Sequence, residues 1–429
     1  MCTAAFARNT IKARPIVTVA PVSWICLLVL SVMFALVALP AGSAPDEEQL
    51  GRSRGYPMGT GRTWFFDERV RVGSFSHLDQ LLPYYTLKKS ATPLPLVAAN
   101  SVAAIGYRFQ GHMRTVEDFL AHQRISGLLI IKDGQILIER YQYDRNAAHR
   151  FVSHSMAKSI VSLAVGLALE EKKIRSLDDW VANYVHGLAG SAYGETSIRN
   201  LLRMSSGVRF REVYDGKDDL AKFTALRSSQ GSIKALRAFS DREVQQGTRF
   251  HYATSETVVL AALLRSATGN NLSEYLTERL WQPMGAEADA TWIKAGDGLE
   301  IGGGSFNAVL RDYGRLGILL ANDGAVGTRQ VVPKQYLLEA TSWRHHPEAF
   351  APMRATSYFG YGYQFWTYPG EKRRFALLGV YGQSIFVDPQ LKLVMVITAA
   401  ARNPSVSNDS LAAERDAVWR GLVSTFGSW

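Results

Sequence analysis

A serine and a lysine three residues apart are the residues of this chain best suited to chemistry. Ser155 and Lys158 form its one Ser-x-x-Lys sequence, and they begin an apolar run that predicts a buried helix over Ser155–Glu171. Residues at i and i+3 share a helix face, so Lys158 is within reach of the Ser155 hydroxyl. That hydroxyl needs a base to become a nucleophile, and apolar surroundings would lower the pKa of Lys158 enough for this task. The unpaired N–H groups of the first turn could hold an oxyanion. A capping serine beside a solvated lysine fits the same pattern, and the motif alone does not decide.

Two further groups carry residues with chemical potential. Tyr252 ends a strand-like approach to an apolar helix, and a phenol beside a lysine can shuttle protons as phenolate; a core tyrosine is the alternative. Gly379 lies on an apolar strand near the C-terminus, followed by Val380 and Tyr381. A glycine there lets a substrate lie close to the strand, and the N–H of Val380 could complete an oxyanion hole; a bulge is the alternative.

Composition narrows the function classes further. Lys and Arg number 48 against 38 Asp and Glu, a net charge of +10, but they are scattered rather than gathered in the stripe typical of nucleic-acid binding. The only cysteines, Cys2 and Cys26, lie near the N-terminus, which argues against a cysteine zinc site, a structural disulfide and a cysteine nucleophile. Zincin and P-loop sequences are absent, so we expect no metal and no cofactor.

The elements that must position these residues follow from the hydrophobic pattern. Two β-rich runs join at Asp133-Gly134, a strong hairpin signal, and a second pair turns at Asp388-Pro389. The stretch between the two pairs is mainly helical. This order predicts an α+β fold, in which the terminal strands form one antiparallel sheet. A mainly helical lobe, roughly residues 172–320, would form the other side of a cleft.

The first 44 residues have the order of a secretory signal. Positive residues precede an apolar stretch over residues 16–40, and small residues follow it. The stretch is also long enough to span a bilayer, so a cleaved signal peptide and an uncleaved membrane anchor are both open. We expect an exported protein, periplasmic or anchored facing the periplasm. Residues 45–70 would be a linker or arm, and residues 71–429 one catalytic domain.

With Ser-x-x-Lys early, a tyrosine in the middle and a glycine-bearing strand late, the chain resembles the serine β-lactamase and penicillin-recognising family. Within its class C-like branch, the chain is most similar to 6-aminohexanoate-dimer hydrolases and related esterases. Other similar segments are the hairpin over 127–141, the helix and Ser-Gly turn over 198–207, the glycine-rich turn over 302–312 and the strand over 382–389.

The resemblance implies a role for each residue. Ser155 would be the nucleophile, Lys158 its base, and Tyr252 the group that passes the proton to the leaving group. The N–H groups of Ser155 and Val380 would form the oxyanion hole. The residues expected closest to the substrate are Gly379 and Tyr381, together with Tyr214 and Asp215 on a loop that borders the cleft unless it is simply solvated.

The sequence departs from the β-lactamase pattern at two positions. Thr254 replaces the Asn of the family's Tyr-x-Asn motif, and Leu377 stands where a cation often binds the β-lactam carboxylate. We therefore expect an ester or amide of a small molecule as substrate. A β-lactamase or D,D-peptidase, and a penicillin-binding sensor without turnover, are the rival functions. The oligomeric state stays open.

Overall fold

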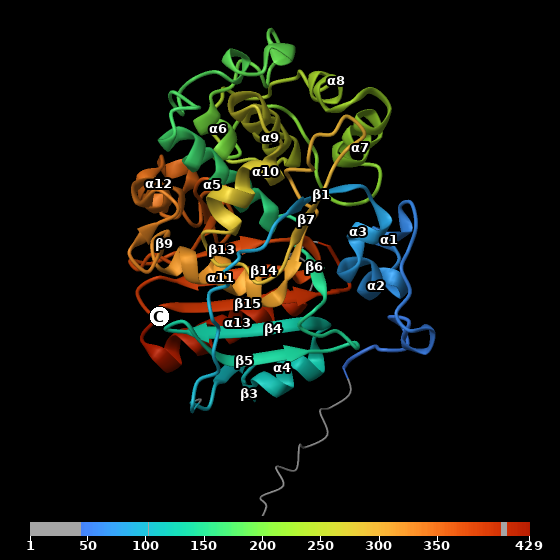
Figure 1. Ribbon diagram of the computed structural model, residues 1–429, viewed down its shortest axis with the longest axis vertical. Coiled ribbons are helices and arrows are strands. Elements are labelled where there is room, and N and C mark those ends of the chain that lie inside the picture. Colours follow the sequence, from blue (N-terminus) through green and yellow to red (C-terminus); the bar gives the residue numbers. More distant parts are fainter. Residues whose placement is uncertain (1–43, 102, 405–409) are drawn as a thin grey trace, which may run out of the picture. The chain divides into compact units, whose positions relative to one another are not determined.

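The computed structural model describes residues 44–101, 103–404 and 410–429. At its centre, a seven-stranded antiparallel sheet joins strands from both ends of the chain (Figure 1). Because β15 pairs with β4, the two predicted strand pairs form one sheet, which confirms the α+β fold. The strands in spatial order are β11 (Gly360–Tyr361), β12 (Trp366–Thr367), β13 (Phe375–Leu378), β14 (Ser384–Asp388), β15 (Leu393–Ala399), β4 (Ile125–Lys132) and β5 (Gln135–Tyr141).

Both faces of this sheet are buried, so its central strands are apolar at successive positions. Along β4, Leu128 and Ile130 pack into one core and Leu129 and Ile131 into the other, as the two-residue period of a strand requires. One face is covered by α11 (Leu310–Ala321), and the other by α4 (Val116–His122) and α13 (Ser410–Phe426).

A smaller antiparallel sheet contains the strand that precedes Ser155. Its strands in spatial order are β1 (Tyr84–Leu87), β7 (Ala290–Ile293), β8 (Phe306–Val309) and β6 (Arg150–Val152). The edge strand β6 is followed directly by α5 (Met156–Glu170), which is buried from Met156 to Ala168 as its apolar sequence predicts. The remaining strands of the described chain form two short hairpins, β2 (Gly106–Phe109) with β3 (His112–Thr115) and β9 (Ala325–Val326) with β10 (Arg329–Gln330).

The helical lobe is narrower than predicted. Its helices are α6 (Ile198–Leu202), α7 (Asp219–Gln230), α8 (Ser232–Arg237), α9 (Thr254–Thr268) and α10 (Leu272–Leu276). Residues 290–320 were expected within this lobe but form β7, β8 and α11, which belong to the sheets. α9 packs along α5, and α12 (Lys334–Ala340) contacts α5 as well, so α5 is the helix on which lobe and sheet meet.

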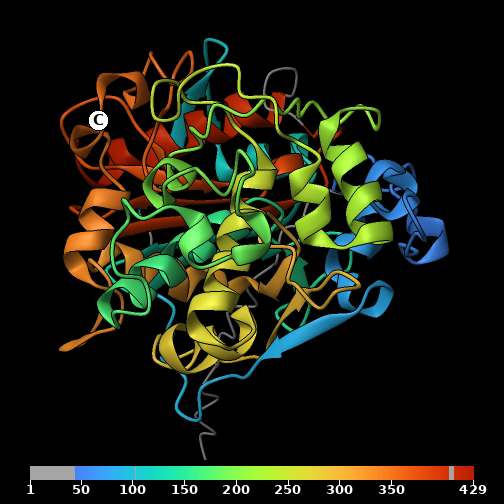
Figure 2. The ribbon, with the colours of Figure 1, turned by 90° about the horizontal axis from the view of Figure 1, so that it is seen from above.

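The segment predicted as a linker or arm is instead packed into the domain. Leu50 and Tyr56 are buried against Tyr143, and the buried guanidinium of Arg124 pairs with acids of this segment. α1 (Thr63–Phe66), α2 (Arg71–Ser76) and α3 (Leu78–Leu81) follow in sequence. Figure 2 shows this blue segment on the same side of the molecule as the yellow-green α7. The domain therefore begins before residue 71, because apolar side chains in an otherwise polar stretch find a core.

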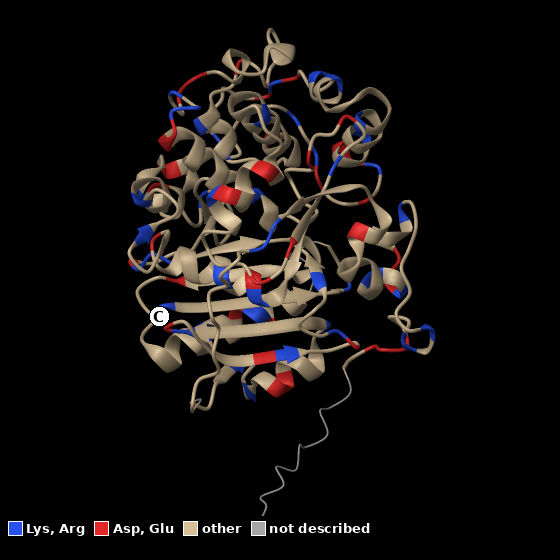
Figure 3. Cartoon of the chain, viewed as in Figure 1, with Lys and Arg blue, Asp and Glu red and all other residues tan. Residues whose placement is uncertain are grey.

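The predicted signal peptide or anchor over residues 1–44 lies outside the described residues, apart from Ala44. Across the described ranges, the helices lack the combination of length and apolar character that crossing a membrane requires. Figure 3 shows Lys and Arg interspersed with Asp and Glu around the described chain, in line with the scattered charges of the sequence.

Candidate active site

Ser155 lies where the chain turns sharply from β6 into α5. The preceding residue, His154, has a φ of 43°, a left-handed conformation that is uncommon outside glycine. The Ser155 side chain makes no capping hydrogen bond to the helix, and it contacts Lys158 instead. Lys158 is only 2% exposed. The alternative of a capping serine beside a solvated lysine is therefore wrong.

The hydrogen bonds of Lys158 determine which way its amine can act. Its Nζ lies 2.9 Å from Ser155 Oγ, 2.9 Å from Thr254 Oγ1 and 2.6 Å from the carbonyl oxygen of Gly303. The Gly303 carbonyl can only accept. The Thr254 hydroxyl donates its only hydrogen to Glu212, so it can only accept a hydrogen bond from Lys158. A neutral amine has two N–H bonds for these acceptors, which leaves its lone pair for the Ser155 hydroxyl.

Burial favours this neutral form of Lys158. Removal from water lowers the pKa of Lys158 to about 8, and the attraction of the Glu212 carboxylate opposes this effect only in part. About a tenth of the amine is therefore unprotonated at pH 7, and about half at pH 8. In that form it can take the Ser155 proton, which an ammonium cannot do.

Glu212 and Gly303 are functional neighbours that sequence reasoning missed. Glu212 accepts hydrogen bonds from the backbone N–H and the hydroxyl of Thr254 and from the hydroxyl of Tyr214. These bonds hold the Thr254 hydroxyl with its lone pairs toward Lys158. Glu212 is far from Thr254 in sequence, so no residue pattern signals its role. The glycine-rich turn over 302–312 marks the region of Gly303, but not the contact, because that contact uses a backbone carbonyl.

Tyr252 lies beside the serine and lysine, at the start of α9. The Nζ atom of Lys158 is 5.1 Å from the centroid of the Tyr252 ring, and the ring stacks on Trp366 of β12 at 5.7 Å. Burial raises the pKa of Tyr252 above its ordinary value, Glu212 raises it further, and the contact with the Ser155 hydroxyl lowers it. The phenol is therefore protonated at neutral pH, so the phenolate considered from the sequence is not its resting form.

Two backbone N–H groups beside Ser155 are free to bind an oxyanion. Within the described ranges, the N–H groups of Ser155 and Val380 donate to no acceptor. The absence of a side chain at Gly379 allows these two N–H groups to lie close together. A Cβ atom at this position would lie 3.1 Å from Ser155 N and only 2.5 Å from the carbonyl oxygen of Ser153. Only glycine allows β13 so close to the start of α5. Tyr381, with a φ of 60°, turns the chain away after Val380.

Two residues expected near the substrate are placed elsewhere. Asp215 is exposed and pairs with Arg211, so this part of the loop is solvated. Tyr381 is only 2% exposed, and the Arg71 guanidinium lies 4.1 Å above its ring centroid. It packs against His154 behind the site and supports it. Tyr214, in contrast, lines the cavity in front of Ser155.

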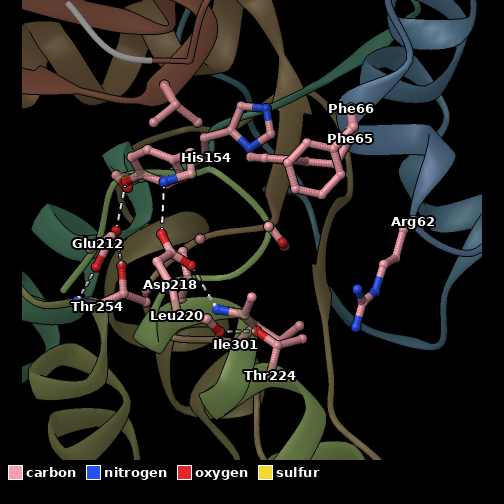
Figure 4. A pocket seen from close by; sticks show the side chains of 18 of the residues that line it. Arg62, Phe65, Phe66, His154, Glu212, Asp218, Leu220, Thr224, Thr254 and Ile301 are labelled. Carbon is pink, nitrogen blue, oxygen red and sulfur yellow. Dashed lines mark hydrogen bonds between the residues drawn. The ribbon is translucent and has the colours of Figure 1, made fainter. Parts of the chain in front are cut away.

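The cavity in front of Ser155 has a volume of about 290 Å³ and three walls. One wall is the N-terminal segment with Trp64, Phe65 and Phe66, and another is α7. Figure 4 shows Phe65 against His154 on one side and Glu212 with Thr254 on the other. The third wall contains Ile301 and the glycine-rich turn. Among the described residues, no three His, Cys, Asp or Glu side chains are grouped as a metal site would require.

Comparison with known proteins agrees with this geometry. The sequence model of the Beta-lactamase family matches residues 113–418. The chain belongs to the Beta-lactamase family. A 6-aminohexanoate-dimer hydrolase from Paenarthrobacter ureafaciens is 25% identical over 367 residues, covering 82% of this chain and 88% of that protein.

Two solved structures place this Beta-lactamase family chain among similar folds. The structure named "Putative 6-aminohexanoate-dimer hydrolase from Bacillus anthracis" has a TM-score of 0.73 at 21% identity, covering 86% of this chain and 98% of the other. A family VIII carboxylesterase has a TM-score of 0.53 at 16% identity, covering 70% and 93%. The resemblance seen in the sequence is confirmed, and the protein is a hydrolase of the Beta-lactamase family.

Proposed function

We propose that this protein is a serine hydrolase that cleaves an ester or amide bond of a small molecule through an acyl-enzyme. The observation that carries the proposal is the buried Lys158 amine, whose two other partners can only accept hydrogen bonds, so that its lone pair faces Ser155. This arrangement activates a serine hydroxyl without a histidine. The likeness to a 6-aminohexanoate-dimer hydrolase supports an amide or ester as the bond cleaved.

The proposed reaction has two halves. Ser155 Oγ attacks the substrate carbonyl carbon while Lys158 takes its proton, and the N–H groups of Ser155 and Val380 hold the resulting oxyanion. The protonated phenol of Tyr252 gives its proton to the leaving oxygen or nitrogen and regains one from Lys158. A water molecule then attacks the acyl-enzyme, Lys158 accepts its proton, and the acid leaves as Ser155 recovers its hydrogen.

An ester or amide fits this site better than a β-lactam. Leu377 is fully buried in the core with Phe375 and Ile385, so β13 presents no charge to the substrate from this position. A β-lactam carboxylate would lack the cation that often binds it in the family.

Purified protein incubated with p-nitrophenyl butyrate and with nitrocefin tests this choice. We expect steady turnover of the ester and at least about tenfold weaker kcat/KM on nitrocefin, since one charge-assisted hydrogen bond is worth about 1.5–3 kcal/mol. Equal turnover of both would favour a β-lactamase. A stable covalent adduct without turnover, detected by intact-protein mass spectrometry, would favour a sensor.

The lowered pKa of Lys158 predicts a characteristic pH dependence. Below pH 8 the amine is increasingly an ammonium that cannot accept the Ser155 proton, so kcat/KM on a neutral ester should fall about tenfold per pH unit. Above pH 8 it should level off once spontaneous ester hydrolysis is subtracted. His154 cannot produce this transition, because burial lowers its pKa to about 3. A profile that stays flat from pH 6 to 9 would contradict a lysine base.

We also propose that the protein acts outside the cytoplasm. The support is the positive, apolar and small-residue order of residues 1–44. Expression of the full chain in a bacterial host, followed by fractionation and N-terminal sequencing, distinguishes a cleaved signal peptide from an anchor. Full-length protein in the cytoplasmic fraction would contradict export.

A further inference from the structure

The acidic and the basic side chains that line the cavity differ in their hydrogen bonds. The two acids are fully engaged inside the protein. Glu212 accepts the Thr254 and Tyr214 hydrogen bonds described above. The Asp218 carboxylate accepts backbone N–H groups at both oxygens, from Val213 and Tyr214 at one and from Ala221 at the other. Neither acid is left to bind a cationic substrate group.

The two cations that line the cavity have no such partners. Among the described residues, the side chains of Arg62 and Arg227 form no hydrogen bond and no ion pair, although their backbone carbonyl oxygens accept hydrogen bonds. Arg227 packs 5.6 Å from the ring centroid of Phe223, and the nearest carboxylate attracting it is Asp297. Both Asp297 carboxylate oxygens already accept backbone N–H groups. Arg62 is exposed, whereas Arg227 is half-buried. Leaving the half-buried Arg227 guanidinium without a partner is costly, and an anion from outside would compensate for it.

The two arginines are on opposite walls, with apolar surface between them. Leu220, Thr224 and Arg227 lie four and three residues apart on α7, so they share the helix face that lines the cavity. Figure 4 shows Arg62 extending from the N-terminal segment into the space opposite this face. Trp64 and Phe65 on one wall and Ile301 on another provide the apolar surface. The cavity thus combines a reactive hydroxyl, apolar walls and two unpaired guanidinium groups.

We propose that Arg227 and Arg62 bind a carboxylate of the substrate, so that the enzyme prefers esters or amides in which a short apolar chain ends in a carboxylate. This inference rests on the proposed function and adds its specificity. Guanidinium groups are suited to the task, because their planar donors match the two oxygens of a carboxylate. This anion site is separate from position 377 on β13, which is buried in the core.

A matched pair of esters tests the inference. Mono-p-nitrophenyl glutarate carries a terminal carboxylate, and p-nitrophenyl butyrate is its neutral counterpart. We expect the wild type to favour the glutarate, and Arg227→Gln to reduce the ratio of the two kcat/KM values by about 10- to 100-fold. Arg62→Gln should reduce it in the same direction, and Arg227→Lys should restore part of it. Melting temperatures verify that each variant is folded.

Lys222→Gln provides the control for charge alone. Lys222 is on the same helix but exposed, and it does not line the cavity. Its loss should leave the ester ratio within about twofold of wild type, because Lys222 lies outside the cavity and solvent screens its charge from a substrate bound there. An unchanged ratio in both arginine variants, or an equal fall in Lys222→Gln, would overturn the inference.

A binding measurement separates this inference from the proposed function. Pentanoate and pentanamide are titrated into the protein while tryptophan fluorescence is followed, since Trp64 lines the cavity. We expect pentanoate to bind at least about tenfold more tightly, and Arg227→Gln to remove the difference. Absence of hydrolysis of either ester would defeat the proposed function but not this result. Equal affinity for the acid and the amide would overturn the anion site even if both esters are cleaved.

Discussion

Replacing Ser155 by Ala should reduce turnover of p-nitrophenyl butyrate by roughly 10⁵–10⁶-fold, the size of loss found when a serine nucleophile is removed. The change deletes the one atom that can form the acyl bond and leaves the backbone N–H in place. Because the Ser155 side chain makes no capping hydrogen bond, the variant should melt close to the wild type. Steady-state kinetics and a thermal unfolding curve on the same preparation measure both effects.

A control serine is available in the N-terminal segment. Ser53 is the middle residue of the only G-x-S-x-G sequence, Gly51–Gly55, and it lies exposed in a short 3-10 helix rather than between a strand and a helix. Ser53→Ala should therefore retain full activity. If Ser155→Ala kept more than a few per cent of the wild-type rate, Ser155 would have no place in the mechanism.

Replacing Lys158 by Ala should cost at least about 10³-fold in kcat/KM, since general-base assistance contributes about 10²–10⁴-fold and the serine depends on it. Small primary amines added to this variant should restore part of the activity, in proportion to their unprotonated fraction. Lys158→Arg is the matched control. It keeps a positive charge, but a guanidinium does not release its proton in proteins, so it should be as inactive as the alanine variant. Activity in Lys158→Arg would show that charge, not base strength, is what the position supplies.

Lys158→Met provides a readout independent of catalysis. The pKa of Lys158 is near 8 in the folded protein and 10.5 ordinarily, so between these values the unfolded chain binds more protons. The free energy of unfolding of the wild type should therefore rise with pH from about 8 to 10.5, relative to the methionine variant. Denaturant titrations at several pH values measure the difference. Parallel curves would show that Lys158 is not shifted by burial.

The sequence predicts the framework of this protein well because its patterns are local. Asp133-Gly134 has the two positive φ angles of a type I′ turn, 51° and 78°, as its residue types require. The apolar run after Ser155 forms the buried helix α5. Both features depend on residues close together in the chain. The resemblance to the family then predicts that Tyr252, distant in sequence, lies near Ser155 and Lys158. The structure places the three residues together.

The remaining parts of the site depend on contacts between distant residues. α7 is only weakly amphipathic, with Phe223 its one buried residue, so periodicity does not reveal it. Trp64 and Phe65 occur in a polar, glycine-rich stretch that reads as a linker, yet they form a wall of the cavity. Asp215 and Tyr214 are adjacent in sequence, but the left-handed conformation of Tyr214 sends the two side chains to different surroundings.

The packing of the N-terminal segment has a practical consequence for engineering. Residues 61–66 contribute a wall of the cavity but no atom to the proposed bond-making steps, and they precede Ser155 by about ninety positions. Within this hexapeptide Trp64 and Phe65 pack against His154 beside the nucleophile, whereas Arg62 and Phe66 are exposed. We therefore expect the two exposed positions to be exchangeable. Libraries in which they alone are varied should change acyl-chain selectivity and leave the rate on a minimal acetyl ester close to that of the wild type. Substrate choice and chemical competence would then evolve as separate traits of one polypeptide.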